Sequence, residues 1–304
     1  MVKLRIKTGS KRIIARYLLL LPTLLLYFLF FIYPVINGLS LGLYKYSGVS
    51  QVKYFIGLRN YADIAIDPQF HNALKNTFII TAVNSIVQFA VGFSLAWLAR
   101  KYIRVGSIFL SVALIPIVLS FVSVGLMWTW FYNSSFGLLN GMVDFLHVNN
   151  ALNFVGLPSI PRSLTANPST ALFSVLLTAN WHGIGLYAVI YSAGLRSISP
   201  SIYDSMKVDG LSDLQKIRRV IFPMLKDTIA LALVLVIAAS FKIFELVYVL
   251  TGGGPGRLTD VISLYLYRYY ASFQAGYASA VSFYMLIIGL ALVVIQFKFL
   301  RTEK

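Results

Sequence analysis

The sequence predicts an all-α integral membrane protein with six transmembrane helices and both termini in the cytoplasm. Three observations predict this fold class. Hydrophobic residues make up 58% of the 304 residues and charged residues only 12%, whereas soluble domains carry about 25% charged residues. Six apolar segments are each long enough to cross a bilayer, and the basic residues gather on one side of them. The chain has no cysteine, which excludes disulfide scaffolds and thiol catalysis.

The six predicted spans divide the chain into its parts. The first is an uncleaved span, because its apolar run is too long for a signal peptide and no small-x-small cleavage site follows. The outer loop after the third span contains "SFGLLNGMVDFL", which has the pattern of an amphipathic interfacial helix. The organisation is a basic N-terminus at 1–16, a transmembrane domain at 17–299 and a tail at 300–304. The spans are about 17–39, 73–98, 106–131, 171–195, 228–250 and 278–299, with a long cytoplasmic loop at 196–227.

The distribution of positive charge sets the orientation. Of the 26 Lys and Arg residues, 18 fall in the N-terminus, the second and fourth connections and the C-terminal end, seven lie on the opposite side, and Lys242 lies within the fifth span. Cations collect on the cytoplasmic side of membrane proteins, which places both termini inside. The same distribution explains the net charge of +16 without a nucleic-acid partner.

The long cytoplasmic loop contains a polar stretch, "YDSMKVDGLSDLQKIRRVIFP", from Tyr203 to Pro223. Its local signals predict two short helices. Ser199 and Pro200 suit the N-cap and first position of a helix, and Gly210 suits a helix C-terminus that needs positive φ. Ser212-x-x-Gln215 has the pattern of a capping box.

The second of these helices carries one apolar face, and Pro223 is predicted to kink or end it just before the chain re-enters the membrane. The stretch can be a solvated basic loop at anionic headgroups or a helical hairpin that docks on a protein partner. The order of caps, apolar face and proline favours docking. The face consists of Leu214, Ile217, Val220 and Ile221, with Leu211 also available to fill a partner's groove.

This stretch resembles the EAA loop of binding-protein-dependent ABC importer permeases, in the form found in carbohydrate importers of the maltose and glycerol-phosphate type. Asp204 stands where the family has Glu, Ser205 and Met206 replace two alanines, and Leu211 replaces a third. Residues that match the pattern are Asp209, Gly210, Ser212, Gln215, Arg218, Arg219 and Pro223. Further similar segments are Gly57–Thr81, Phe136–Asn140, Tyr191–Ser205 and Val247–Pro255.

The resemblance implies a type I ABC importer permease fold in the plasma (inner) membrane of a bacterium or archaeon. It implies a second permease, commonly a different chain, two cytoplasmic ATPase subunits that bind ATP and Mg, and an extracellular or periplasmic solute-binding protein. The chain itself would bind no cofactor or metal, would be no enzyme, and would pass a sugar or oligosaccharide. The expected ATPase-coupling residues are Asp204, Asp209, Gly210, Leu211, Ser212, Leu214, Gln215, Arg218 and Pro223.

Candidates for the substrate path are polar or aromatic residues within the spans. Lys242 and Glu245 are three apart on the fifth span and would share a helix face, either lining the path or forming an ion pair with each other. Trp181 and His182 on the fourth span, and Asn84 and Gln88 on the second, are further candidates.

Other functions are less favoured. Glycerol phosphate is an alternative solute. An ion-coupled secondary transporter needs carboxylate relays, but Glu245 is the one carboxylate clearly within a span. A membrane enzyme needs a cluster of His, Asp or Glu, and the three histidines are scattered.

Overall fold

Helices form nearly all of the regular structure in this computed structural model, which describes residues 20–49 and 51–301. The predicted basic N-terminus at 1–16, the start of the first span and residues 302–304 of the tail lie outside the described residues. The described chain divides into two units. The first contains residues up to Ile66 and 269–284, and the second contains 67–268 and the residues from Met285 onward.

The first unit begins with an apolar helical run over Leu20–Leu43. It includes a π-helical turn, η1 (Phe28–Ile32), then α2 (Tyr33–Ser40) and a 3-10 turn, η2 (Leu41–Leu43). A small antiparallel hairpin of β1 (Tyr44–Lys45) and β2 (Tyr54–Phe55) leads to α3 (Arg59–Ile66). Asn60 fastens these pieces, because its amide donates to the carbonyls of Gly42 and Tyr44 at 2.8 and 3.1 Å. Two helices, α15 (Ile262–Ala271) and α16 (Ala275–Arg301), have residues in both units.

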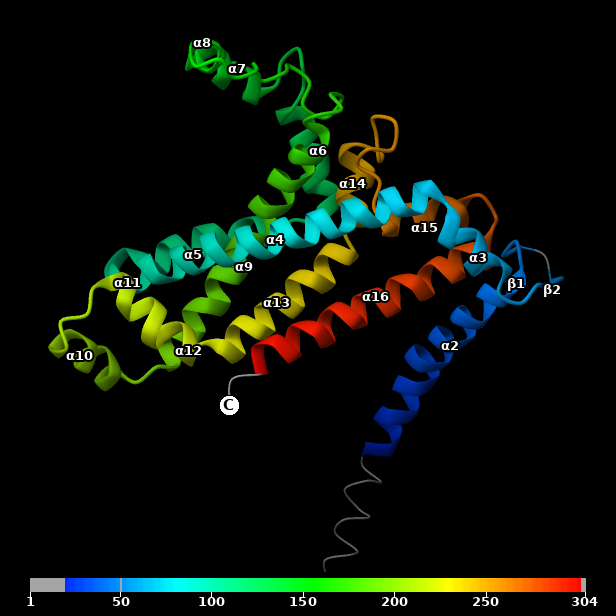
Figure 1. Ribbon diagram of the computed structural model, residues 1–304, viewed down its shortest axis with the longest axis horizontal. Helices are drawn as coiled ribbons and strands as arrows, with labels where there is room; N and C mark the ends of the chain where they lie inside the picture. The colour runs from blue at the N-terminus through cyan, green and yellow to red at the C-terminus, as the bar shows by residue number, and fades with distance from the viewer. Residues whose placement is uncertain (1–19, 50, 302–304) are drawn as a thin grey trace, which may run out of the picture. The chain divides into compact units, whose positions relative to one another are not determined.

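The second unit is organised around α4 (Pro68–Lys101) and α9 (Ala171–Ser197), which pack against each other, with α5 (Ile103–Val118) against α9 and α13 (Lys226–Phe241) against α4 (Figure 1). Pro68 opens α4, and the Asp67 carboxylate caps it by accepting from the Gln69 N–H at 2.7 Å. Glycine permits the close approach of α5 and α9, because a Cβ on Gly185 would overlap the backbone carbonyl of Ala113. Interiors of membrane bundles commonly use small residues in this way.

Two predicted spans are broken rather than continuous. The third consists of α5 and α6 (Phe121–Phe131), which meet at 98°. Ser120 begins α6 by accepting from the Ser123 N–H at 3.2 Å, so a local cap competes with helix continuation at that point. The fifth ends at Phe241 and resumes as α14 (Phe244–Leu250). Each of the predicted spans 106–131 and 228–250 therefore consists of two helices in the structure.

Four helices in the described residues are long and apolar enough to cross a membrane: Leu20–Leu43, Pro68–Lys101, Ala171–Ser197 and Ala275–Lys298. Two bent pairs raise the number to six if each pair is one span. They are Gly106–Val118 with Phe121–Phe131, and Asp213–Met224 with Lys226–Phe241. The connection at 132–170 carries α7 (Leu138–Phe145), as its pattern predicted, and α8 (Val148–Phe154), which was not anticipated.

Candidate functional site

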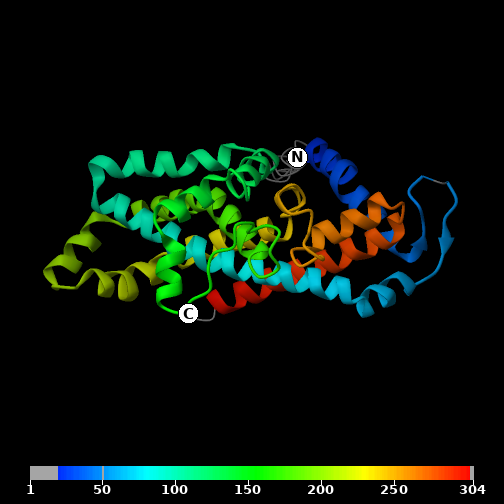
Figure 2. The ribbon, with the colours of Figure 1, turned by 90° about the horizontal axis from the view of Figure 1, so that it is seen from above.

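The polar stretch between α9 and α13 folds into a hairpin at the end of the second unit where α4 ends (Figures 1 and 2). We call residues 200–224 the 200–224 hairpin. It comprises α10 (Pro200–Val208), α11 (Asp213–Lys216), a π-helical turn η3 (Ile217–Ile221) and α12 (Phe222–Met224). The predicted helix–turn–helix is thus confirmed.

The turn of the hairpin is a Schellman motif centred on Gly210. Gly210 has φ +66°, its N–H donates to the Lys207 carbonyl at 3.1 Å, and the Leu211 N–H donates to the Met206 carbonyl at 3.2 Å. These two bonds satisfy carbonyls that the helix end leaves free. Met206 is buried beneath the turn and Leu211 packs on the same cluster, so the apolar contact that accompanies this motif is present.

The second helix starts with the predicted capping box. The Ser212 hydroxyl accepts from the Gln215 N–H at 3.4 Å, and the Gln215 side-chain oxygen accepts from the Ser212 N–H at 2.9 Å. Ser199 occupies the N-cap of α10 as predicted, but its hydroxyl contacts the Ser201 hydroxyl instead of a backbone N–H. The cap at the tip of the hairpin therefore makes both of its side-chain–backbone bonds, whereas the cap at the entry makes none.

Pro223 does not end the second helix. The helix continues to Met224, and the chain turns by 77° at Leu225 before α13. Proline removes one backbone donor, and the π-helical turn over Ile217–Ile221 lies immediately before it. A local widening of the helix is a recognised way to absorb such a defect, so Pro223 shapes the helix while the bend falls at Leu225.

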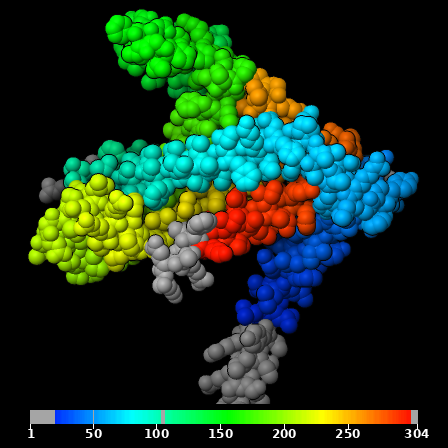
Figure 3. Space-filling view, in the orientation of Figure 1, coloured from blue at the N-terminus to red at the C-terminus, as the bar shows by residue number. Residues whose placement is uncertain are grey.

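The predicted apolar face is divided between the chain's own core and the surface. Ile221 is buried, and Leu211, Ile217 and Val220 pack against the cluster around Tyr191 and Leu195. Leu211 and Ile217 are thus partly buried by the chain's own core, and only part of each side chain is open to a partner. Leu214 and Val208 are instead 74% and 87% exposed, on a hairpin that stands at the surface in the space-filling view (yellow-green, Figure 3).

The charged residues expected to contact an ATPase are also at the surface. Asp204, Asp209 and Arg218 are exposed, and Asp204 pairs within its own helix with Lys207 at 2.9 Å. The Asp204 carboxylate is thus held in place and still 69% exposed.

Two contacts to the end of α4 anchor the hairpin, and the sequence did not reveal them. The Arg100 guanidinium lies 3.5 Å from the centre of the Tyr203 ring, and both side chains donate to the Leu195 carbonyl, at 3.3 and 3.0 Å. Lys101 pairs with Asp213 at 3.1 Å. Burial raises the pKa of the Tyr203 phenol, and the Arg100 charge opposes that rise. The basic pair at 100–101 had indicated only orientation, because its partners lie about 100 residues away in the sequence.

Asn84 and Gln88, two of the path candidates, are buried between helices of the second unit. The Asn84 carbonyl oxygen accepts from the Asn180 amide at 2.9 Å, and its amide donates to the Ser240 hydroxyl at 3.1 Å. These bonds link α4 to α9 and α13. Gln88 lies against Gly183 and its side-chain oxygen is buried without a hydrogen bond. In the isolated chain both amides face the protein interior.

Trp181 and His182 have different surroundings. The His182 ring is buried, its Nε2 lies 3.1 Å from the Leu119 carbonyl, and it contacts the Phe121 ring at a tilt of 36°. His182 therefore supports the break between α5 and α6. Trp181 is half-exposed and meets Trp128 edge-to-face at 5.5 Å. Trp181 and Trp128 line an aromatic hollow of about 520 Å³ together with Met127, Trp130, Phe131, Phe136 and Leu138.

Lys242 and Glu245 do not share a helix face, because Lys242 and Ile243 form the break between α13 and α14. In the part of the chain that the structure describes, neither residue makes an ion pair with the other, and both are exposed. The expectation of a shared face was wrong, and within the described residues neither charge has an ion-pair partner.

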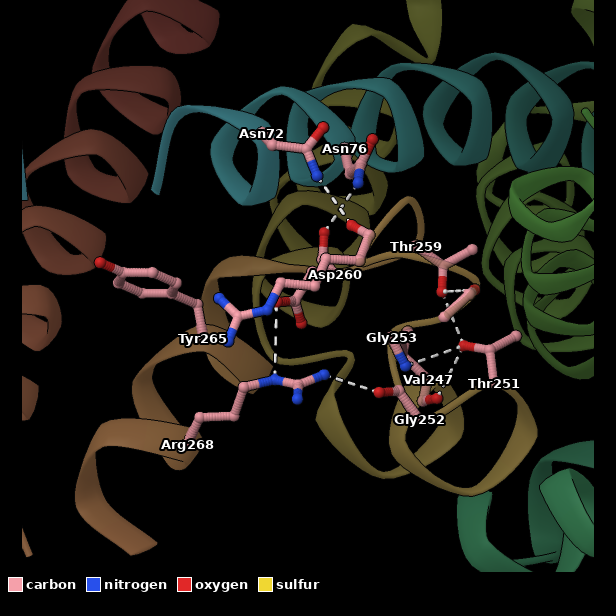
Figure 4. A network of polar contacts seen from close by, with 12 residues as sticks. Asn72, Asn76, Val247, Thr251, Gly252, Gly253, Thr259, Asp260, Tyr265 and Arg268 are labelled. Atoms are coloured by element: carbon pink, nitrogen blue, oxygen red, sulfur yellow. Dashed lines mark hydrogen bonds and ion pairs between the residues drawn. The ribbon is translucent and has the colours of Figure 1, made fainter. Parts of the chain in front are cut away.

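The segment after α14 is held by the polar network of Figure 4. Arg268 donates to the Gly252 carbonyl at 2.6 Å and pairs with the buried Asp260 carboxylate at 3.5 Å. The Asn76 amide donates to the Leu258 and Asp260 carbonyls at 2.8 and 2.9 Å. Burial raises the pKa of Asp260, opposed by the nearby Arg268 and Arg257 charges. The network ties this segment to α4.

Residues 78–301 match the family described as "Binding-protein-dependent transport system inner membrane component". The chain belongs to this family. Among relatives of this permease, a probable ABC transporter permease protein of Bacillus subtilis, YurN, is 34% identical and covers 95% of this chain and 96% of its own. The trehalose/maltose transport system permease protein MalF of Thermococcus litoralis is 27% identical, and the match covers 93% of this chain and 92% of MalF.

A solved structure has the same fold as this permease. One chain of a bacterial alginate ABC transporter, in complex with an alginate pentasaccharide-bound periplasmic protein, superposes with a TM-score of 0.74. It is 25% identical, and the match covers 96% of each chain. The resemblance identified from the EAA-like loop is thereby confirmed, and the permease is an inner-membrane component.

Proposed function

We propose that the permease is one of two membrane subunits of an ATP-driven importer and forms, with a second homologous permease, the path for a sugar or oligosaccharide. Two cytoplasmic ATPases that bind ATP and Mg drive it, and a binding protein outside the membrane delivers the solute. In this proposal the chain crosses the membrane six times, so that both termini and the 200–224 hairpin lie in the cytoplasm. The permease itself hydrolyses nothing.

The observation that carries this proposal is the exposed tip of the hairpin. Val208 and Leu214 present apolar side chains to solvent on the same hairpin as the exposed Asp204 carboxylate, although the rest of the apolar face is buried or partly buried against the chain's own core. Exposed apolar groups rimmed by charge suit docking on a protein. The anchors from Arg100 and Lys101 connect this tip to α4, so movement of a docked ATPase would be passed to a spanning helix.

Two features support a carbohydrate as the solute. Relatives that cover most of the chain are named for transport of trehalose and maltose, of lactose and of sulfoquinovosyl glycerol. The aromatic hollow beside Trp181 offers flat apolar faces of the kind on which sugar rings stack. Trp181 is therefore the strongest of the path candidates.

A glycerol phosphate is the second candidate, favoured by one observation. Lys242 stands exposed at the break in the fifth span without a carboxylate partner in the described chain, and a relative 24% identical is named for sn-glycerol-3-phosphate transport. An anionic solute would find its counter-charge there.

Co-purification and uptake test the proposal. The permease, extracted in mild detergent, should co-purify with a second permease and an ATPase. Vesicles reconstituted with this complex should take up the solute only when ATP is present on the side of the membrane that carries the ATPase. Asp204→Lys should abolish uptake at normal membrane abundance, whereas the matched reversal Asp63→Lys, at an exposed carboxylate of α3, should leave it intact. Uptake that ignores ATP, or full activity of Asp204→Lys, refutes the proposal.

A further inference from the structure

A hollow of about 310 Å³ separates the end of α4 from the 200–224 hairpin. We call it the basic hollow. The residues of both anchoring contacts line it, whereas the exposed Val208 and Leu214 do not. Its lining consists of Trp97, Arg100, Lys101, Tyr203, Lys207, Asp213 and Lys216.

The lining has more positive than negative charge. Lys101 and Lys216 share the single carboxylate of Asp213, at 3.1 and 3.4 Å. Lys207 has its own partner in Asp204. The described partners of Arg100 are the Tyr203 ring and the Leu195 carbonyl, and neither neutralises the guanidinium charge. Two cationic charges are therefore left uncompensated around one small space, which favours an anion.

The form of the hollow points to a phosphate. Three ammonium groups and a guanidinium offer donors from several directions, which suits a tetrahedral oxyanion better than a planar carboxylate. A second hollow of about 460 Å³ shares Arg100 and adds Arg196 and the Ser107 and Ser192 side chains. Positive lining therefore continues around the end of α4.

The hollow also lies at a distinctive depth. Trp97 is one helical turn before Lys101, at the end of a 34-residue apolar helix. Indole rings concentrate at the level of lipid headgroups, and basic pockets on the cytoplasmic side hold anionic headgroups. A phosphate at this level would contact α4 and the hairpin together.

We propose that the basic hollow binds a phosphate-bearing anion, supplied by the headgroup of an anionic phospholipid of the inner leaflet, and that this anion holds the 200–224 hairpin against α4. The placement of the hollow on the cytoplasmic side rests on the proposed function. Bound phosphate relieves the repulsion between Lys101, Lys216 and Arg100, so the hairpin is held more tightly in an anionic membrane.

Titration of short-chain phosphatidylglycerol into the assembled, detergent-purified transporter tests the site. The wild type should bind it saturably and more weakly at high salt, whereas phosphatidylcholine should not bind. The Lys101→Gln/Lys216→Gln variant removes two cations without removing the Arg100–Tyr203 contact. Its affinity should fall roughly 30-fold, from the usual contribution of a basic residue at an anionic surface.

Controls separate the possible outcomes. Lys53→Gln/Lys75→Gln also removes two cations, from the first unit and from the opposite end of α4, and should bind phosphatidylglycerol as the wild type does. Competition by inorganic phosphate would identify free phosphate as the source and still support the site. Equal binding by phosphatidylcholine, or by the Lys101→Gln/Lys216→Gln variant, overturns it.

Binding that appears only after the ATPase is stripped away also overturns the proposal, because the ATPase would then cover the hollow. Failure of the proposed function has a different signature: absence of ATP-dependent uptake while saturable phosphatidylglycerol binding persists.

Discussion

Replacement of Gly210 tests whether the geometry of the hairpin tip is what an ATPase recognises. Gly210 lies in the left-handed region with φ +66° and donates one hydrogen bond of the Schellman motif, while the Leu211 N–H donates the other. Gly210→Val places a β-branched residue there. Gly210→Asn is the matched control, because asparagine is one of the few other residues that adopts this conformation readily.

The expected cost follows from the space around the residue. A Cβ at Gly210 would meet no atom within 4 Å, so steric overlap with neighbours contributes nothing and the cost is that of the backbone conformation. An L-residue in this region costs about 1–2 kcal/mol, which shifts a conformational equilibrium by about 5- to 30-fold. Valine should incur this full cost and asparagine only part of it.

The assay is the affinity of the purified permease pair for its ATPase subunit, measured alongside membrane abundance. Gly210→Val should weaken binding by up to about 30-fold, because the docking-competent turn is less populated. Gly210→Asn should stay within about threefold of the wild type. The reasoning is refuted if valine binds as well as glycine, or if both variants are equally weak, since the φ of Gly210 would then not control recognition.

Three further predictions follow from named contacts. Asp213→Asn removes an exposed ion pair with Lys101, so hydrogen exchange in the hairpin should accelerate by at most about fivefold. If the difference in exchange rate between variant and wild type is the same in high salt, its cause is not electrostatic. Gly253→Ala should lower the free energy of unfolding by about 1–3 kcal/mol, because φ is +85° and the new Cβ would lie 2.5 Å from Arg268 Nη2. Gly289→Ala, with open space around it, is its control in thermal unfolding. Lys242→Gln and Glu245→Gln should have additive effects on uptake, within about 0.5 kcal/mol. Strong coupling in the double variant would show that the two side chains do form an ion pair with each other.

Local signals in the sequence were sufficient for the membrane class and for the hairpin tip. Helix caps depend on residues three or four apart, so Ser212 and Gln215 predict their own bonds and Gly210 predicts its own φ. Long apolar runs likewise predict helices wherever they occur. None of these inferences requires knowledge of what packs beside the segment.

Tertiary structure decided where the fifth span breaks and which apolar residues of the hairpin remain exposed. The break at 242–243 contains neither proline nor glycine, yet α13 ends there. Phe241, the last residue of α13, and Ile243, within the break, are both buried. The apolar residues of the hairpin have the spacing of one face, but neighbouring helices partly bury Ile217 and leave Leu214 exposed.

The two contacts that anchor the hairpin to α4 could likewise be found only from the tertiary structure. Arg100 is 103 positions from Tyr203 in the sequence. Only the packing of α4 against the C-terminal end of α9 brings the Arg100 guanidinium to the Tyr203 ring. The sequence by itself determined a membrane permease with a capped polar hairpin, because those features depend on near neighbours. The tertiary structure decided how that hairpin is fastened, because fastening depends on residues that meet only after the helices pack.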